Sequence, residues 1–178
     1  MYFQKIKTED LYLSPLEANK DIEEFTRLVN EDSDIAYHNA FYHKSLNSTK
    51  VASMIELWSK GECAFAIIEK ESDKLIGNIS LFNINNLARK GEIGIFIAKD
   101  YRSKGYGKQA LDAFLNFVFA YLNLHKVEIN VLGFNLKAKA FYESLGFKLA
   151  GVLREAYYFD NKYHDTYILD LLKKEYYN

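Results

Sequence analysis

The sequence predicts an α/β fold in which a mixed sheet of about seven strands is flanked by about four helices. Segments in which apolar residues alternate are interleaved with segments in which they recur every three or four residues, and these periods are typical of strands and helices. Tyrosine (14) and phenylalanine (13) are abundant whereas proline occurs once, which favours a large sheet. Because 178 residues with 49% hydrophobic content suit one core, we expect residues 1–178 to form a single domain.

The N-terminal region is predicted to contain one strand and two helices. Residues 11–13 form the strand, and Ser14 can cap the following helix with Pro15 at its first position. The apolar stripe of that helix consists of Ile22, Phe25, Leu28 and Val29. Residues 30–47 are polar and aromatic, so we expect an irregular connector there, and residues 48–60 return to helical spacing.

Strands dominate the rest of the chain. They are expected over residues 63–69, 75–82, 92–98 and 126–132, and a final hairpin pairs residues 147–154 with 163–171. One helix follows residues 102–108 and carries an apolar stripe of Leu111, Phe114, Leu115, Val118, Phe119 and Leu122. A second helix covers residues 135–145.

Composition excludes several classes of function. The net charge is −1 and there is no long basic run, which argues against nucleic acid as a partner. The single cysteine, Cys63, is expected to be a buried, inert thiol in a reducing compartment. No segment has signal-peptide or membrane-spanning character, so we expect a cytoplasmic protein and no membrane partner. The four histidines lack metal-binding spacing, so no metal is expected.

A basic glycine turn follows the strand at residues 92–98 and opens a helix. It consists of Arg102, Ser103, Lys104, Gly105, Tyr106, Gly107 and Lys108. Glycines allow backbone N–H groups to approach an anion, and a helix N-terminus adds unpaired donors and a positive dipole end. The pattern therefore predicts a pyrophosphate site. Taken alone it is a weak signal, because many such turns contain glycine for packing reasons, and it fits neither a Walker A loop nor a Rossmann fingerprint.

The combination of this turn with a later segment resembles one family. Strand 95–98, the Arg-x-x-Gly-x-Gly turn, Asn135, and Ala-Phe-Tyr-Glu-Ser-Leu-Gly-Phe at residues 140–147 are similar to the GNAT superfamily of acetyl-CoA-dependent N-acetyltransferases. Residues 151–172 resemble its bacterial subgroup of ribosomal-protein N-terminal and spermidine acetyltransferases. The resemblance implies a mostly antiparallel, splayed sheet. It also implies direct attack of a primary amine on acetyl-CoA in a ternary complex.

The resemblance assigns roles to individual residues. Phe96, Ile97 and Ala98 would pair with the pantetheine arm as an extra strand, the turn would hold the pyrophosphate, and Asn135 and Lys137 would contact the cofactor. Tyr142 would touch the cofactor and act as the general acid, because a phenol stays protonated at neutral pH. From spacing alone, Tyr142 is better explained as a core aromatic on a helix stripe.

The proton acceptor is harder to identify. Glu92 shares a strand face with Phe96 and Ala98, and it could be a base, directly or through a water, or an ordinary ion-paired carboxylate. Glu128 and Asn130 share a face of the next strand, where the family often places a base. Asn130 stands where some protein N-terminal acetyltransferases carry glutamate, and asparagine cannot accept a proton.

The acceptor amine is left open by the sequence. Glu31, Asp32 and Asp34 could face a cationic amine, or they could be a solvated loop. A polyamine, an amino sugar, a protein N-terminus and an aminoglycoside-like drug all fit. The aromatic segment at residues 157–177 could form a homodimer face. A non-catalytic acetyl-CoA-binding sensor is the alternative from another functional class.

Overall fold

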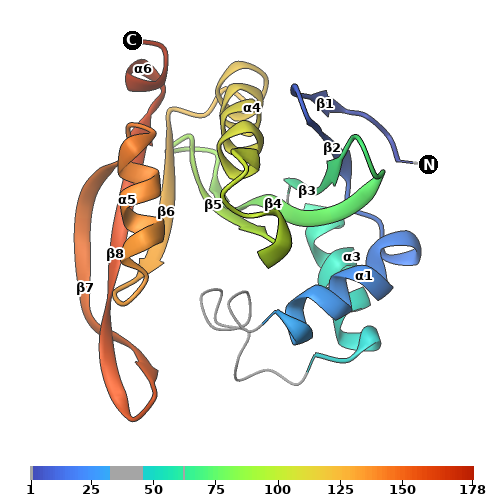
Figure 1. The fold of residues 1–178 in the computed structure, drawn as a ribbon. Helices are drawn as coiled ribbons and strands as arrows, with labels where there is room; N and C mark the ends of the chain where they lie inside the picture. Colours follow the sequence, from blue (N-terminus) through green and yellow to red (C-terminus); the bar gives the residue numbers. More distant parts are fainter. Residues whose placement is uncertain (1, 33–45, 62) are drawn as a thin grey trace. The chain divides into compact units, whose positions relative to one another are not determined.

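The computed structural model of the chain describes residues 2–32, 46–61 and 63–178 (Figure 1). Within these residues, eight strands form one mixed, mostly antiparallel sheet in the order β1-β2-β3-β4-β5-β6-β8-β7. Contacts divide the chain into two compact units, Met1–Phe82 with Gly94–Phe117 and Asn83–Ile93 with Val118–Asn178. The mixed sheet is confirmed, with one strand more than predicted, whereas the single domain stays a prediction.

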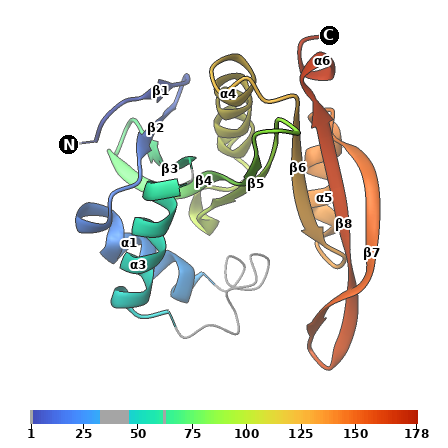
Figure 2. The same ribbon diagram turned by 180° about the vertical axis from the view of Figure 1, so that it is seen from behind.

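The first unit contains an antiparallel array of strands. Its strands are β1 (Ile6–Lys7), β2 (Leu11–Pro15), β3 (Cys63–Glu69) and most of β4 (Lys74–Asn85). Two helices, α1 (Ala18–Glu31) and α3 (Ser48–Gly61), pack side by side (Figure 2). The Phe25 ring of α1 lies 5.4 Å from the Phe96 ring and 5.8 Å from the Trp58 ring of α3, both edge-on. These aromatic contacts join the helices to the strand that carries Phe96.

The predicted start of the first helix is wrong. Ser14 is fully buried within β2 and Pro15 pairs with Phe65 of β3, so neither residue belongs to the helix. The helix begins at Ala18, and the Asp21 carboxylate accepts a hydrogen bond from the Glu17 N–H at 2.7 Å. Pairing with β3 therefore outweighs the local capping signal, and Asp21 satisfies a donor at the helix start.

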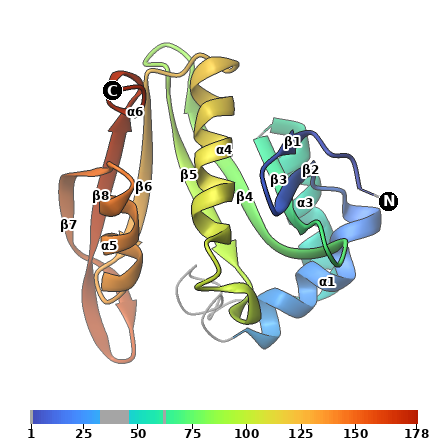
Figure 3. The same cartoon turned by 45° about the horizontal axis from the view of Figure 1, so that its top comes forward.

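The end of β5 (Lys90–Ile97) and the start of α4 (Tyr106–Ala120) complete the first unit. A 3₁₀ turn, η1 (Lys99–Tyr101), lies between them. Within this unit α4 lies beside β4 and β5 (Figure 3), and its Phe114 ring is 6.0 Å from the Phe65 ring of β3. The predicted apolar stripe is buried except at Leu122, which lies beyond the helix end and is exposed. Leu124 is buried instead, because the chain turns back after Ala120 and its N–H reaches the Val118 carbonyl.

The second unit is built on β6 (Lys126–Leu132), β7 (Lys148–Phe159) and β8 (Lys162–Leu172), with α5 (Leu136–Ser144) and α6 (Lys173–Tyr176). β6 pairs in parallel with the start of β5, from Lys90↔Lys126 to Glu92↔Glu128, and antiparallel with β8. The α5 helix lies beside β6 and β8 (Figure 1), with the Lys139 ammonium over the Tyr167 ring. β7 and β8 form a long hairpin, as predicted, with a bulge between Leu153 and Tyr157. No helix among the described residues is long and apolar enough to span a membrane.

Candidate active site

The glycine turn has the backbone geometry that an anion site needs. Ser103 and Gly105 are both left-handed, with φ of 62° and 83°. A Cβ built on Gly105 would meet no atom within 4 Å, so the space in front of this residue is open. The Gln109 N–H donates to the Gly105 carbonyl at 3.1 Å and closes the first turn of α4. The amides of residues 106–108 precede this hydrogen bond, and they are the donors that a helix N-terminus offers to an anion.

Side chains of the turn anchor it to the sheet. The Tyr106 hydroxyl donates to Glu69 at the end of β3 (2.9 Å), and this hydrogen bond raises the pKa of Tyr106. The Gln109 amide donates to the Asp10 carboxylate (2.7 Å) and accepts from the Thr8 hydroxyl (2.9 Å). The first turn of α4 is therefore held by side chains from two other segments of the same unit, the end of β3 and the connection between β1 and β2.

Arg102 braces the turn from the other side. Its Nη2 lies 2.8 Å from Asp32 Oδ2, and its Nε donates to the Ile97 carbonyl at 2.7 Å. The same Asp32 oxygen accepts the Lys99 N–H at 2.8 Å. The Asp32 side chain is 7% exposed, so the ion pair is largely shielded on the carboxylate side. A residue predicted to contact phosphate and one predicted to contact substrate thus bind each other.

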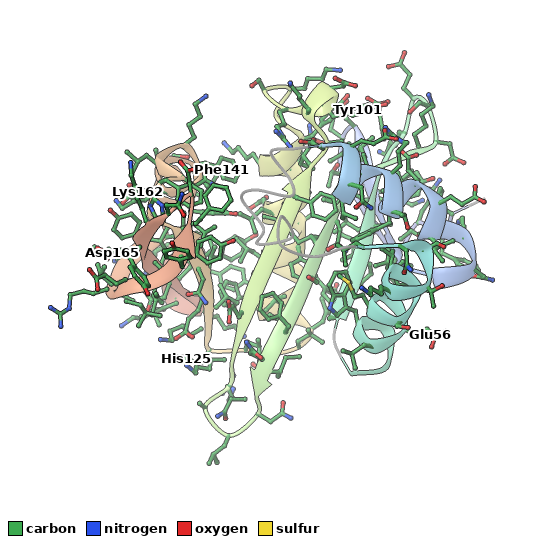
Figure 4. All side chains as sticks on the ribbon, turned by 90° about the horizontal axis from the view of Figure 1, so that it is seen from below. Glu56, Tyr101, His125, Phe141, Lys162 and Asp165 are labelled. Carbon is green, nitrogen blue, oxygen red and sulfur yellow. The ribbon has the colours of Figure 1, made fainter. Side chains whose placement is uncertain are left out.

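Lys104 and Lys108 remain as the exposed cations of the turn. The Lys104 ammonium lies 5.1 Å from the centroid of the Tyr101 ring, which is labelled in Figure 4. This distance is within the range of a cation–π contact. Both ammonium groups are exposed, so they can add long-range attraction for an anion.

The strand that precedes the turn is tightly packed. Phe96, Ile97 and Ala98 are all buried, and the Ala98 N–H donates to the Ile76 carbonyl of β4 at 2.8 Å. A Cβ built on Gly77 of β4 would lie 2.2 Å from the Phe96 carbonyl oxygen. Only glycine permits β4 to approach β5 this closely, so Gly77 fixes the backbone of the segment predicted to pair with pantetheine.

In the second unit, α5 holds three residues of the prediction. Asn135 is its N-cap, and the Asn135 Oδ1 accepts the Ala138 N–H at 3.1 Å. This hydrogen bond uses the carbonyl side of the amide, so a ligand would be met by the NH₂ side. Lys137 is exposed in the first turn. Tyr142 is 8% exposed, and its ring lies 5.3 Å from Phe141 (labelled in Figure 4) and 5.8 Å from Phe147. Burial raises the pKa of Tyr142 to about 12.

Glu92 lies in a network of neutral amides within the second unit. Asn130 Nδ2 donates to Glu92 Oε1 at 2.6 Å, and Asn83 Nδ2 donates to Glu92 Oε2 at 2.9 Å. Sequence reasoning noted that Asn130 cannot be a base but did not find these contacts. Asn83 was missed altogether, because its role depends on a left-handed backbone (φ 51°) within β4 that no sequence motif marks.

Glu128 has a different environment although it is the register partner of Glu92. Its carboxylate lies 2.7 Å from the Lys126 ammonium and 3.1 Å from the Lys90 ammonium. Partial burial acts in the opposite direction, but the two lysines hold the pKa of Glu128 below its usual value. Lys126 also reaches Asp170 of β8 at 3.4 Å. A carboxylate held in this way is a poor proton acceptor near neutral pH.

The other predicted residues have contacts of their own. Glu31 accepts from Arg27 at 3.2 Å, one helical turn away, and Asp34 lies outside the described residues. Cys63 is half-buried rather than buried as predicted, and this burial raises the pKa of its thiol to about 11, which fits an inert thiol. Among residues 2–32, 46–61 and 63–178, no three histidine, cysteine, aspartate or glutamate side chains gather as metal ligands would. Roles for Glu31, Asp32 and Asp34 in substrate binding stay predictions.

Comparisons with known proteins agree with the predicted resemblance. The family model for the acetyltransferase (GNAT) domain matches residues 10–148. A spermidine N(1)-acetyltransferase of Vibrio cholerae is 33% identical over 112 residues, which are 63% of this chain and 65% of that protein. The putative ribosomal N-acetyltransferase YdaF of Bacillus subtilis is 37% identical over 101 residues, which are 57% of this chain and 55% of that protein. The chain thus spans less than two thirds of the length of either relative.

A solved structure extends the similarity to nearly the whole chain. The crystal structure of spermidine N-acetyltransferase from Vibrio cholerae in complex with CoA and spermine superposes with a TM-score of 0.86 at 27% identity. The match covers 96% of this chain and all of that one. The predicted fold and the family resemblance are confirmed by these matches, and the chain belongs to the GNAT acetyltransferase family.

Proposed function

We propose that this protein transfers the acetyl group of acetyl-CoA to a primary amine, and that the amine belongs to a small polyamine. The observation that carries the first half is the glycine turn, in which an open left-handed glycine is followed by helix N-terminal amides. This arrangement suits a pyrophosphate group. It lies within the residues that the family model matches.

The polyamine acceptor is supported by the relatives. A spermidine acetyltransferase is among the most similar curated proteins, and the superposed structure of such an enzyme holds CoA and spermine. A putative ribosomal acetyltransferase is similarly close, so a protein N-terminus is the competing acceptor. The Glu92 carboxylate suits a cationic amine, because its hydrogen bonds from Asn83 and Asn130 bring no positive charge.

The proposed reaction is a direct attack in a ternary complex. The neutral amine attacks the thioester carbonyl, the C–S bond breaks, and CoA leaves as a thiol. Glu92, directly or through a water, takes the proton that the ammonium loses before the attack, and Tyr142 gives its phenolic proton to the departing sulfur. The nitrogen loses a second proton as the amide forms, and this proton returns to the Tyr142 oxygen. The high pKa of Tyr142 keeps this proton in place before the reaction. Alignment of the two substrates supplies much of the rate.

A panel assay tests this function. Acetyl-CoA is incubated with the protein and with spermidine, spermine, putrescine, glucosamine or an unblocked peptide, and the released thiol is measured. We expect turnover with at least one polyamine and slower turnover with the other amines. Turnover of the peptide alone would overturn the polyamine assignment. If calorimetry shows acetyl-CoA binding but no amine releases thiol, the protein is a non-catalytic sensor and the enzymatic proposal fails.

A further inference from the structure

We propose that Asn83 and Asn130 are positioning residues that hold the Glu92 carboxylate in the orientation and ionisation state in which it accepts a proton from the amine. This proposal rests on the function proposed above. It adds two residues to which neither the family resemblance nor the comparisons give a role.

The geometry assigns one amide to each carboxylate oxygen. Asn130 of β6 donates to Oε1 at 2.6 Å, and Asn83 of β4 donates to Oε2 at 2.9 Å. The donors come from different strands, so together they fix both the position and the plane of the carboxylate. Each carboxylate oxygen has two lone-pair sites, and one donor on each leaves acceptor capacity for an ammonium or a water.

The chemical nature of the donors matters as much as their position. An amide holds a carboxylate without bringing a positive charge, so it costs the carboxylate less of its basicity than an ammonium does. Glu128 shows the opposite case one strand away, where two lysines lower its pKa. Two carboxylates in register thus receive different partners. Glu128 is held by cations, whereas the partners of Glu92 are neutral.

The charged groups around Glu92 are largely paired among themselves. Lys90 on its own strand and Lys126 on β6 bind Glu128, and Lys126 also reaches Asp170 on β8. β4 contributes the neutral Asn83 to this group. Neither Asn83 nor Asn130 belongs to these ion pairs, so substituting either asparagine changes the contacts of Glu92 without breaking one of them.

The backbone conformation at residue 83 favours asparagine over most other residues. Its φ of 51° is left-handed, a conformation that asparagine tolerates better than most residues and that β-branched residues avoid. A left-handed residue inside a strand turns its side chain away from the ordinary alternation. Asn83→Gly removes the amide but keeps this backbone accessible, so it is a better test than alanine.

Two measurements on the intact protein test the proposal. The first follows the side-chain carboxyl carbon of Glu92 by NMR in protein labelled at glutamate, with the resonance assigned from Glu92→Gln. Asn130→Asp would bring a second carboxylate to the Glu92 oxygen. We expect the apparent pKa of the pair to rise by about one unit or more, because like charges at this distance cannot both ionise easily.

The second measurement is the pH dependence of kcat/KM for an accepted amine. Asn130→Asp should move the rising limb to higher pH by a similar amount. Asn130→Ala and Asn83→Gly should lower kcat about tenfold, at the low end of what acid–base catalysis contributes, while KM for acetyl-CoA stays within twofold. In a Glu92→Gln background the same changes should have no further effect on the profile, which a merely structural role would not predict.

The two measurements separate this proposal from the function on which it rests. If Asn130→Ala and Asn83→Gly leave the Glu92 resonance and its titration unchanged, the positioning role is wrong whatever the activity. If the titration shifts but the pH profile of an active enzyme does not, the asparagines hold a carboxylate that takes no part in proton transfer. If the wild type turns over no amine, the proposed function fails, and with it the catalytic purpose of the network.

Discussion

Replacing Arg102 with alanine should destabilise the protein even in the absence of a phosphate ligand. The guanidinium makes a 2.8 Å ion pair with Asp32 and a 2.7 Å hydrogen bond to the Ile97 carbonyl. Hydrogen bonds to charged groups contribute about 1.5–3 kcal/mol each. Arg102 is 32% exposed, so solvent reduces this value, but Asp32 is 7% exposed and would lose this ion pair. We expect the free energy of unfolding to fall by about 2–3 kcal/mol, between the values for surface and buried pairs.

A double-mutant cycle with Asp32→Asn gives this prediction its control. Asparagine keeps an oxygen that can accept the Lys99 N–H, so this variant should cost less, about 1–2 kcal/mol. The double variant should cost little more than Arg102→Ala alone, with a coupling of about 1–2 kcal/mol. Urea unfolding at neutral pH measures all four proteins.

The acetyl-CoA affinity of the same variants then shows whether Arg102 stabilises the turn or binds phosphate directly. If Arg102 acts through the backbone of the turn, both single changes weaken acetyl-CoA binding by a similar factor, and the double variant is no weaker. If the guanidinium binds phosphate itself, Arg102→Ala weakens binding and Asp32→Asn does not, since the second change releases the arginine toward the ligand. Unchanged stability in Arg102→Ala, together with lost affinity, would refute the reasoning.

Three further predictions concern single residues. Gly105→Ala adds a Cβ in open space where the ligand is expected, so acetyl-CoA affinity measured by calorimetry should fall at least tenfold, about 1.4 kcal/mol. Gly146 is also left-handed (φ 91°), so Gly146→Ala is the control and should lower stability without changing this affinity. Gly77→Ala drives a Cβ into the Phe96 carbonyl, so it should lower the free energy of unfolding in urea by about 1–3 kcal/mol and weaken acetyl-CoA binding. The Cβ of Gly94→Ala would meet the Phe82 side chain at 3.1 Å, so this control variant should lose less stability. Tyr142→Phe should lower kcat about 10²–10⁴-fold with little change in acetyl-CoA affinity. Because the pKa of Tyr142 is raised from about 10 to about 12, the phenol contributes stability below pH 10 that is lost as the pH rises through 12, and kcat should show no limb from it below pH 10.

Local patterns predicted the elements whose structure depends on nearby residues. Strands β3 and β6 begin and end at the predicted residues, because both are apolar, alternating segments bounded by polar turns. The start of α1 was wrong for the opposite reason. Its boundary depends on pairing between Pro15 and Phe65, which are distant in the sequence, and no local signal reports that pairing.

The candidate site divides in the same way. The glycine turn could be found because its function depends on backbone geometry that a few consecutive residues encode. The Arg102–Asp32 pair joins residues 70 positions apart, so nothing local in the sequence connects the two charges. The prediction therefore placed Arg102 at the pyrophosphate and Asp32 at the amine. The contact of Asn83 with Glu92 spans nine positions but needs a left-handed residue within a strand, which residue type alone does not specify.

The contacts of the turn lead to a different account of anion binding from the one that its charges suggest. Arg102 and Tyr106 direct their side chains to Asp32 and Glu69, which are themselves anions. A phosphate at the turn would therefore be bound mainly by backbone amides at a fixed position, with Lys104 and Lys108 adding solvated charge. Backbone amides in direct contact with a phosphate are screened little by salt, whereas exposed lysines are screened strongly. The affinity of this site for acetyl-CoA should consequently depend more on the left-handed glycine than on any single cation. The reason is that Arg102 and Tyr106 contact Asp32 and Glu69, residues that are distant from the turn in the sequence.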